Sequence, residues 1–201
     1  MNIIEKESIK LLLELINKSF NVDKFKEEKS NLDKINTIIN ILNLKIDSKI
    51  KLVGHGTNSC VYYVNNKIIK IGFFKLNKTI INNSKIIKVY FKDNIELLYN
   101  NKLIKIGIEI QNLAILNNNI IISDLYNLYR DLRDDRILWV DVKSSNVGYY
   151  NNKLVVIDTD DCYFIKNNES ILNDKSIFYV NDIARKFELI YNESMEVDNS
   201  E

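Results

Sequence analysis

The chain has 201 residues, of which 46% are hydrophobic, and its formal net charge is +1. This length and composition allow a hydrophobic core in one domain or in two small lobes. The balanced charge provides no overall field for nucleic acid or an anionic membrane, so we expect neither as a partner. No apolar run reaches the roughly 18 residues of a membrane span, and the N-terminus lacks a signal-peptide profile.

Cysteine and histidine are scarce, since the chain has only Cys60, Cys162 and one histidine. Two cysteines are too few for a disulfide framework and favour a reducing compartment, and the set does not favour a zinc site. We therefore expect a cytoplasmic protein. The abundance of isoleucine, lysine and asparagine is typical of AT-rich codons, so the asparagine-rich stretches are weak signs of disorder.

Residues 1–48 predict two helices. Apolar residues between Ile9 and Ile16 recur at helical spacing opposite charged side chains. Asn31 is placed to cap a second helix with an apolar face. We interpret this segment as a helical extension that packs on the rest of the chain rather than as a partner-binding arm, because amphipathic helices are usually structural.

From Ile50 the apolar period becomes that of strands. A strand leads into the turn Gly54-His55-Gly56, and two further strands follow, joined at Asn65-Asn66, with Lys70 on the last one. Glycines let backbone N–H groups approach phosphate oxygens, and a lysine two strands later could reach the same phosphates. A glycine pair between strands is by itself more often an ordinary turn.

A second polar stretch is WVDVKSSNVGYYNNKLVVIDTD, in which Asp141, Lys143 and Asn146 follow at fixed intervals. Two short strands joined by an Asn151-Asn152 turn come next, and Asp158 ends the second strand. Because a hairpin returns the chain, we expect Asn146 and Asp158 to lie side by side. Two oxygen ligands with a third carboxylate nearby would suit Mg²⁺.

Taken together, these stretches resemble the protein kinase-like superfamily over roughly residues 50 to 160. Four motifs stand in the family's order, each in its expected strand or loop. They are the glycine-rich loop Gly54-x-Gly56-x-x-Ser59-x-Val61, with serine for the third glycine, the strand lysine Lys70, the catalytic loop Asp141-x-Lys143-x-x-Asn146, and Asp158-Thr159-Asp160 in place of the metal-binding DFG triplet.

The resemblance implies an α+β, bilobal, protein kinase-like fold. We expect the N-terminal helical extension at residues 1–48, an antiparallel β-sheet N-lobe at 49–124, a truncated helical C-lobe at 125–192 and an acidic tail at 193–201. The cofactors implied are ATP and Mg²⁺.

Site roles follow from the resemblance residue by residue. Asp141 would accept or orient the proton of the substrate hydroxyl, and Lys143 would face the γ-phosphate. Asn146 and Asp158 would hold Mg²⁺, and Lys70 would bind the α- and β-phosphates.

Two further positions are inferred from their place in the chain. A hairpin over residues 113–123 would end at Asp124, the hinge against which adenine lies. Glu96, on an amphipathic segment, is our choice for the helix-borne partner of Lys70, and Glu109 is the runner-up.

The chain also departs from the family pattern. Trp139 and Val140 replace the histidine and arginine before Asp141, which removes the usual pairing with a phosphorylated activation loop. Trp139 is expected in the core, whereas Asp160 and Asp161 are expected to be solvated.

The part after the hinge is abbreviated. One short helix is expected at 125–136, and another at Ser176 to Tyr191, in which Asp182 resembles the aspartate that braces the catalytic loop. In this respect the chain resembles compact bacterial effector and viral kinases, some of which need an activating partner protein in the host cytoplasm.

Three functions remain open. The first is a minimal serine/threonine protein kinase that transfers the ATP γ-phosphate to a protein hydroxyl. The second is a pseudokinase, a nucleotide-binding interaction module, which the shortened C-lobe favours. The third is a small-molecule kinase, against which Lys143 argues because that class lacks this lysine.

Overall fold

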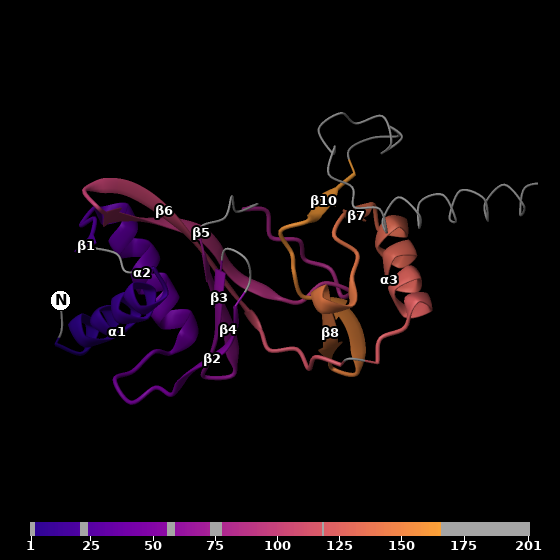
Figure 1. Cartoon of the computed structure of the whole chain (residues 1–201), viewed down its shortest axis with the longest axis horizontal. Coiled ribbons are helices and arrows are strands. Elements are labelled where there is room, and N and C mark those ends of the chain that lie inside the picture. The colour runs from indigo at the N-terminus through magenta and orange to yellow at the C-terminus, as the bar shows by residue number, and fades with distance from the viewer. Residues whose placement is uncertain (1–2, 21–23, 56–58, 73–77, 118, 166–201) are drawn as a thin grey trace, which may run out of the picture. The chain divides into compact units, whose positions relative to one another are not determined.

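The computed structural model describes residues 3–20, 24–55, 59–72, 78–117 and 119–165. The chain forms two compact units. Unit 1 comprises residues 1–80 and 88–113, and unit 2 comprises residues 81–87 and 114–201. The elements of each unit are labelled in Figure 1.

Unit 1 is built on a six-stranded sheet in the order β1-β5-β6-β4-β3-β2, in which every neighbouring pair is antiparallel. The strands are β1 (Lys24–Phe25), β2 (Ile50–His55), β3 (Ser59–Val64), β4 (Lys67–Gly72), β5 (Val89–Tyr99) and β6 (Lys102–Asn112). The antiparallel sheet expected from the alternating pattern after Ile50 is therefore present.

Asparagine pairs make the tight turns of the hairpins. Asn65 and Asn66 between β3 and β4 have φ values of 45° and 63°, and Asn100 and Asn101 between β5 and β6 have 48° and 58°. Asparagine tolerates this left-handed region better than most residues, which suits two-residue hairpin turns.

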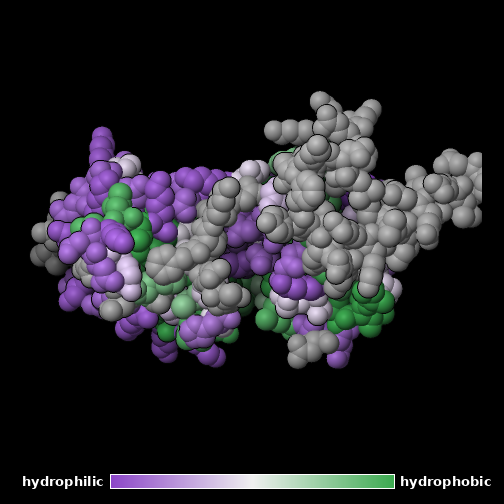
Figure 2. All heavy atoms as spheres, turned by 45° about the horizontal axis from the view of Figure 1, so that its top comes forward, coloured by the Kyte–Doolittle hydropathy of each residue, from purple (hydrophilic) through white to green (hydrophobic). Residues whose placement is uncertain are grey.

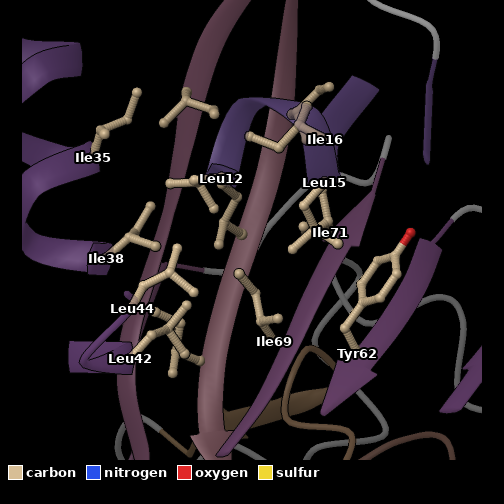
Figure 3. Packing of buried hydrophobic residues seen from close by; sticks show 14 of the residues in the cluster. Leu12, Leu15, Ile16, Ile35, Ile38, Leu42, Leu44, Tyr62, Ile69 and Ile71 are labelled. Atoms are coloured by element: carbon tan, nitrogen blue, oxygen red, sulfur yellow. The ribbon is translucent and has the colours of Figure 1, made fainter. Parts of the chain in front are cut away.

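Helices α1 (Ile3–Phe20) and α2 (Lys29–Leu42) lie on one side of this sheet (Figure 1). Their apolar faces meet the side chains of alternate strand residues in one core, shown in Figure 3. Leu12, Ile16, Ile35, Ile38, Ile69 and Ile71 are fully buried there. The predicted helical segment thus packs on the sheet of unit 1, in line with the expected structural role.

Asn31 was expected to cap the second helix, and that expectation is wrong. Helix α2 begins at Lys29 with Glu28 at its N-cap. The buried Asn31 side chain instead donates to the carbonyl oxygens of Lys26 and Glu96, each at 3.0 Å. Its amide therefore ties α2 to β5 and to the residue that follows β1, because a buried amide needs partners that the helix backbone does not supply.

Unit 2 contains α3 (Ile122–Asp134) and two small antiparallel ladders. One pairs β7 (Ile137–Trp139) with β10 (Cys162–Phe164), and the other pairs β8 (Val147–Tyr150) with β9 (Lys153–Val156). The segment 81–87 lies along β9, since Ile86 forms a parallel bridge to Val156. Trp139 is fully buried in this core, as expected.

The boundary between the units differs from the expected one. The chain passes from unit 1 to unit 2 at Leu113–Ala114, not at residue 124, and the segment 81–87 belongs to unit 2. The hairpin expected over 113–123 does not form, because α3 begins at Ile122 and places Asp124 in its first turn. Leu125 and Leu128 are buried on the inner side of α3, so helical spacing governs this stretch.

Much of the visible surface is hydrophilic, with small separate hydrophobic areas (Figure 2). Both cysteines are buried free thiols. None of the helices in the described ranges is long and apolar enough to cross a membrane. The expected helix from Ser176 to Tyr191 with Asp182, the acidic tail at 193–201, and Gly56 lie outside the described residues.

Candidate functional site

The loop after β7 brings three of the expected site residues together. A short 3₁₀ helix, Ser144–Asn146, folds Asn146 back toward Asp141. The Asn146 amide donates from Nδ2 to Asp141 Oδ2 at 2.7 Å and to the Asp141 carbonyl oxygen at 3.0 Å. The Lys143 ammonium forms an ion pair with the same Asp141 oxygen.

Asp158 lies next to this group because of the β8–β9 hairpin. Its turn residues Asn151 and Asn152 have φ values of 50° and 61°, and Val147 pairs with Val156. One step further along, the Ile157 N–H donates to the Asn146 carbonyl oxygen at 2.8 Å. The residue after Ile157 is Asp158, so the hairpin places the backbone of Asp158 beside that of Asn146, as the sequence predicts.

Negative charge is concentrated at this end of unit 2. Burial, and then the carboxylates of Asp158, Asp141 and Asp160, raise the pKa of Asp161 to about 6, against an ordinary value of 3.8. Like charges raise a carboxyl pKa only when they lie close enough to interact. The structure thus gathers four acidic side chains, and Asp161, which we expected to be solvated, is half-buried among them.

The donor set fits a magnesium ion. The Asn146 nitrogen is bound to Asp141, which leaves the amide oxygen as the atom available to a cation. Within the described part of the chain, no group of three or more His, Cys, Asp or Glu side chains is arranged to hold a metal. Mg²⁺ commonly takes only one or two protein carboxylates and completes its shell with water and substrate phosphates, so the residue types of Asn146 and Asp158 are compatible with this ion.

In unit 1, Lys70 is paired with a strand residue. Lys70 on β4 lies opposite Glu109 on β6, and its Nζ is 3.4 Å from Glu109 Oε1. Lys92 on β5 lies on the other side of Glu109, with its Nζ 3.2 Å from Oε2. The partner of Lys70 is therefore Glu109, which we placed second.

The choice of Glu96 as the partner of Lys70 is wrong. Glu96 lies within strand β5, not on a helix, and its carboxylate pairs with Lys26 at 3.2 Å and Lys105 at 3.5 Å. Its hydrogen bond with Lys26 holds the pKa of Glu96 below its usual range. The charged residues in β5 resemble a helix face, but the long pairing of β5 with β6 overrides that pattern.

The glycine-rich turn is only partly described. Gly54 lies on β2, whereas Ser59 and Val61 lie on β3. Gly54 does not have a positive φ, and a Cβ there would meet no described heavy atom within 4 Å. Neither backbone strain nor packing against the described residues requires a glycine at this position.

Two residues near the expected sites escaped the sequence-based prediction or were undervalued in it, and one predicted residue does not hold. Lys92 belongs to no sequence motif, and only the pairing of β5 with β6 shows that it lies opposite Glu109. Asp161 follows the Asp158-Thr159-Asp160 triplet, and only the structure shows that it lies among the other three carboxylates. Asp124 is withdrawn as an adenine-facing hinge residue because it belongs to α3.

The chain matches no protein-family model, and no curated protein matches it. The geometry of the two units therefore carries the functional argument.

Proposed function

We propose that the chain is a Mg-ATP-dependent phosphotransferase, a minimal serine/threonine-type kinase that transfers the ATP γ-phosphate to a protein hydroxyl. One observation carries this: the Asp141 carboxylate is bound by Asn146 and Lys143 while Asp158 adjoins Asn146. One loop and one hairpin thus supply a carboxylate that can act as a base, a lysine cation, and two residues of the kinds that bind Mg²⁺. Phosphoryl transfer requires these groups.

We assign Asp141 the role of accepting or orienting the proton of the substrate hydroxyl. Its carboxylate is half-buried and held in place by Asn146, which supports a fixed orientation toward a hydroxyl. Lys143 is exposed and bound to Asp141. Its ammonium can therefore neutralise charge on a phosphoryl group close to the attacking oxygen.

Asn146 and Asp158 would hold Mg²⁺, which supplies charge neutralisation on the nucleotide phosphates. The neighbouring Asp160 and Asp161 strengthen the local negative field that attracts a divalent cation. Lys70, half-buried and paired with Glu109, would bind the α- and β-phosphates.

The kinase-like bilobal arrangement is part of the same proposal. Unit 1, with its antiparallel sheet, would correspond to the N-lobe, and unit 2 to a reduced C-lobe. The protein substrate would present a serine or threonine hydroxyl, and the activity would take place in the cytoplasm, with an activating partner protein if the shortened C-lobe needs one.

A nucleotide-binding module without transferase activity is the second candidate. One observation favours it: Asp141 Oδ2 already accepts from both Asn146 and Lys143. An oxygen engaged by two donors is a weaker proton acceptor.

The deciding experiment measures Mg-ATP binding by calorimetry and transfer from γ-labelled ATP to a mixed protein substrate and to the chain itself. The variants are Asp141→Asn and, as control, Asp47→Asn, an exposed acid in unit 1. Transfer by the wild type and the control that disappears in Asp141→Asn supports the kinase. Binding with equal background in all three supports the module, and no binding overturns both.

A further inference from the structure

A bulge at the start of β5 sets the position of the Tyr90 side chain. The register of β5 against β6 shifts between Val89 and Phe91, so Tyr90 is an extra residue in the ladder. Bulges redirect side chains and are over-represented next to functional sites. The Tyr90 hydroxyl donates to Oδ1 of the buried Asn112 at 2.8 Å, and this hydrogen bond fixes the orientation of the ring.

Two lysines lie over this ring. The ammonium nitrogens of Lys67 and Lys88 are 4.0 Å and 5.0 Å from the centroid of the Tyr90 ring, a range at which an aromatic face attracts cations. Lys67 begins β4 opposite Asn112, and Lys88 directly precedes β5. The pairing of the strands therefore brings the two lysines together. Lys88 is exposed and Lys67 is half-buried, so this lysine pair is accessible to a ligand.

In the part of the chain that the structure describes, neither lysine of the pair meets a carboxylate, and both contact the Tyr90 ring. Lys70 and Lys105 in the same sheet, by contrast, each pair with a glutamate. An ammonium group has three N–H donors, so contact with a ring leaves donors for a second partner. Because two like charges near one ring repel each other, an anion that binds both would relieve that repulsion.

The lysine pair is separate from the proposed nucleotide site. Successive side chains of a strand alternate between the two faces of a sheet. Lys67 therefore shares the face of Ile69 and Ile71, which pack in the helical core (Figure 3), whereas Lys70 is on the other face. An anion bound by the lysine pair is thus distinct from the triphosphate proposed for Lys70.

We propose that Lys67 and Lys88 bind a phosphate monoester carried on a serine or threonine of another protein. Such a group has about two negative charges at neutral pH, which matches two ammonium groups better than one carboxylate does. Lysine binds phosphate as a point charge on a flexible stem, so both side chains can reach one phosphate. Anionic lipid sites typically use roughly four to eight basic residues, which favours a protein over a membrane. The choice of a phosphoprotein rests on the proposed function, which makes phosphorylated serine or threonine.

The test uses the full chain, immobilised, and two degenerate peptide pools that differ only in carrying phosphoserine or serine at the central position. The chain should enrich peptides from the phosphoserine pool only. The most enriched peptide is then labelled, and its affinity is measured by fluorescence anisotropy beside versions with serine or glutamate at that position. Both versions should bind at least about tenfold more weakly, because they lack the doubly charged phosphate.

Two double variants show whether the lysine pair is responsible. Lys67→Met/Lys88→Met should weaken the phosphoserine peptide by about tenfold or more, because both charge-assisted contacts are lost. Lys51→Met/Lys102→Met is the matched control, since it removes two exposed lysines of the same sheet and the same net charge. It should stay within about threefold of the wild type, because distant exposed charges are screened by salt. Thermal unfolding checks that both variants are folded.

Equal affinity in the two double variants would overturn the inference, and so would a chain that enriches both pools alike or neither. Inorganic phosphate that competes with the affinity of the peptide itself would make free phosphate the ligand and overturn the partner protein. Binding through the lysine pair to vesicles containing phosphatidylserine, without peptide binding, would overturn it in favour of a membrane. Failure of the proposed function gives a different result, since no phosphate is then transferred from labelled ATP while the phosphoserine peptide still binds through the lysine pair.

Discussion

The Asn146 side chain and the Asp141 carboxylate are joined by a 2.7 Å hydrogen bond, and the same amide nitrogen also reaches the Asp141 carbonyl oxygen at 3.0 Å. Asn146 is buried, so both bonds are shielded from water. This amide therefore fixes Asp141 and simultaneously directs its own oxygen away from that carboxylate.

Asn146→Ala should lower both stability and phosphotransfer. Loss of the shielded bonds should cost about 1–2 kcal/mol in the free energy of unfolding, measured in urea. Transfer from labelled ATP should fall by about a hundredfold, because the base loses its orientation and the metal a ligand. Transfer unchanged in a destabilised variant would assign Asn146 a purely structural role.

Asp158→Ala should abolish Mg-dependent nucleotide binding while the thermal stability without metal changes little. The reason is that a carboxylate in a crowded acidic group binds a cation well but adds little stability without one. Calorimetric titration with ATP, with and without Mg²⁺, measures the first effect. The exposed Asp47→Ala serves as control, and a large loss of melting temperature in the metal-free Asp158→Ala variant would mean that this residue is structural.

Two glycines should respond oppositely to alanine. Gly54→Ala should leave stability unchanged or raise it by up to about 1 kcal/mol, because its Cβ meets open space. Gly148→Ala should cost about 1–3 kcal/mol, because its Cβ would lie 3.0 Å from Ala114 Cβ and 3.1 Å from the Ile115 carbonyl oxygen.

The Gly54→Ala variant also tests whether the glycine-rich turn binds phosphate. Nucleotide affinity should weaken by about tenfold or more in Gly54→Ala, because a methyl group obstructs close approach of phosphate to the backbone. If Gly54→Ala binds Mg-ATP as the wild type does, the glycine-rich turn is an ordinary turn.

Asp161→Asn should stabilise the protein above pH 6. The folded-state pKa of Asp161 is raised to about 6 from 3.8. Between these two pH values the folded state therefore holds a proton that the unfolded state has released. The stability contributed by this group is present below pH 3.8 and is lost as the pH rises through about 6. Asparagine does not titrate and avoids this loss.

Melting curves from pH 4 to pH 8, without divalent cations, measure this effect. The variant should exceed the wild type by about 2–4 °C at pH 8, the shift that about 1 kcal/mol causes in a chain of this size, after allowing for the partial exposure of the carboxyl. The two melting temperatures should converge toward pH 4. A constant difference across this range would place Asp161 outside the interacting acidic group.

Leu12→Ala should destabilise unit 1 by about 2–5 kcal/mol, because the Leu12 side chain is fully buried between the helices and the sheet. Chemical denaturation measures the loss. Glu14→Ala on the same helix removes only an exposed side chain and should change stability by less than about 0.5 kcal/mol. Similar values for both variants would mean that α1 does not belong to the core.

Much of the fold can be predicted from local patterns. Helical spacing indicates α1 and α2, and the asparagine pairs at Asn65 and Asn151 mark two hairpins that the structure contains. Asn100–Asn101 is an equivalent turn signal, but the charged residues of the β5 segment resemble one face of a helix and obscure it. Only the pairing of β5 with β6 over their full length decides between helical and strand spacing. Many of the residues that pair there are far apart in the sequence.

The sequence by itself determined the grouping of Asp141, Lys143, Asn146 and Asp158, because a short loop and a two-residue turn leave the chain few ways to arrange them. Only the tertiary structure decided that Glu109 rather than Glu96 meets Lys70, and that Lys92 joins them. Those contacts depend on strand order and register, which arise when distant strands bury their apolar faces together, and a shift of one residue would turn each side chain to the other face.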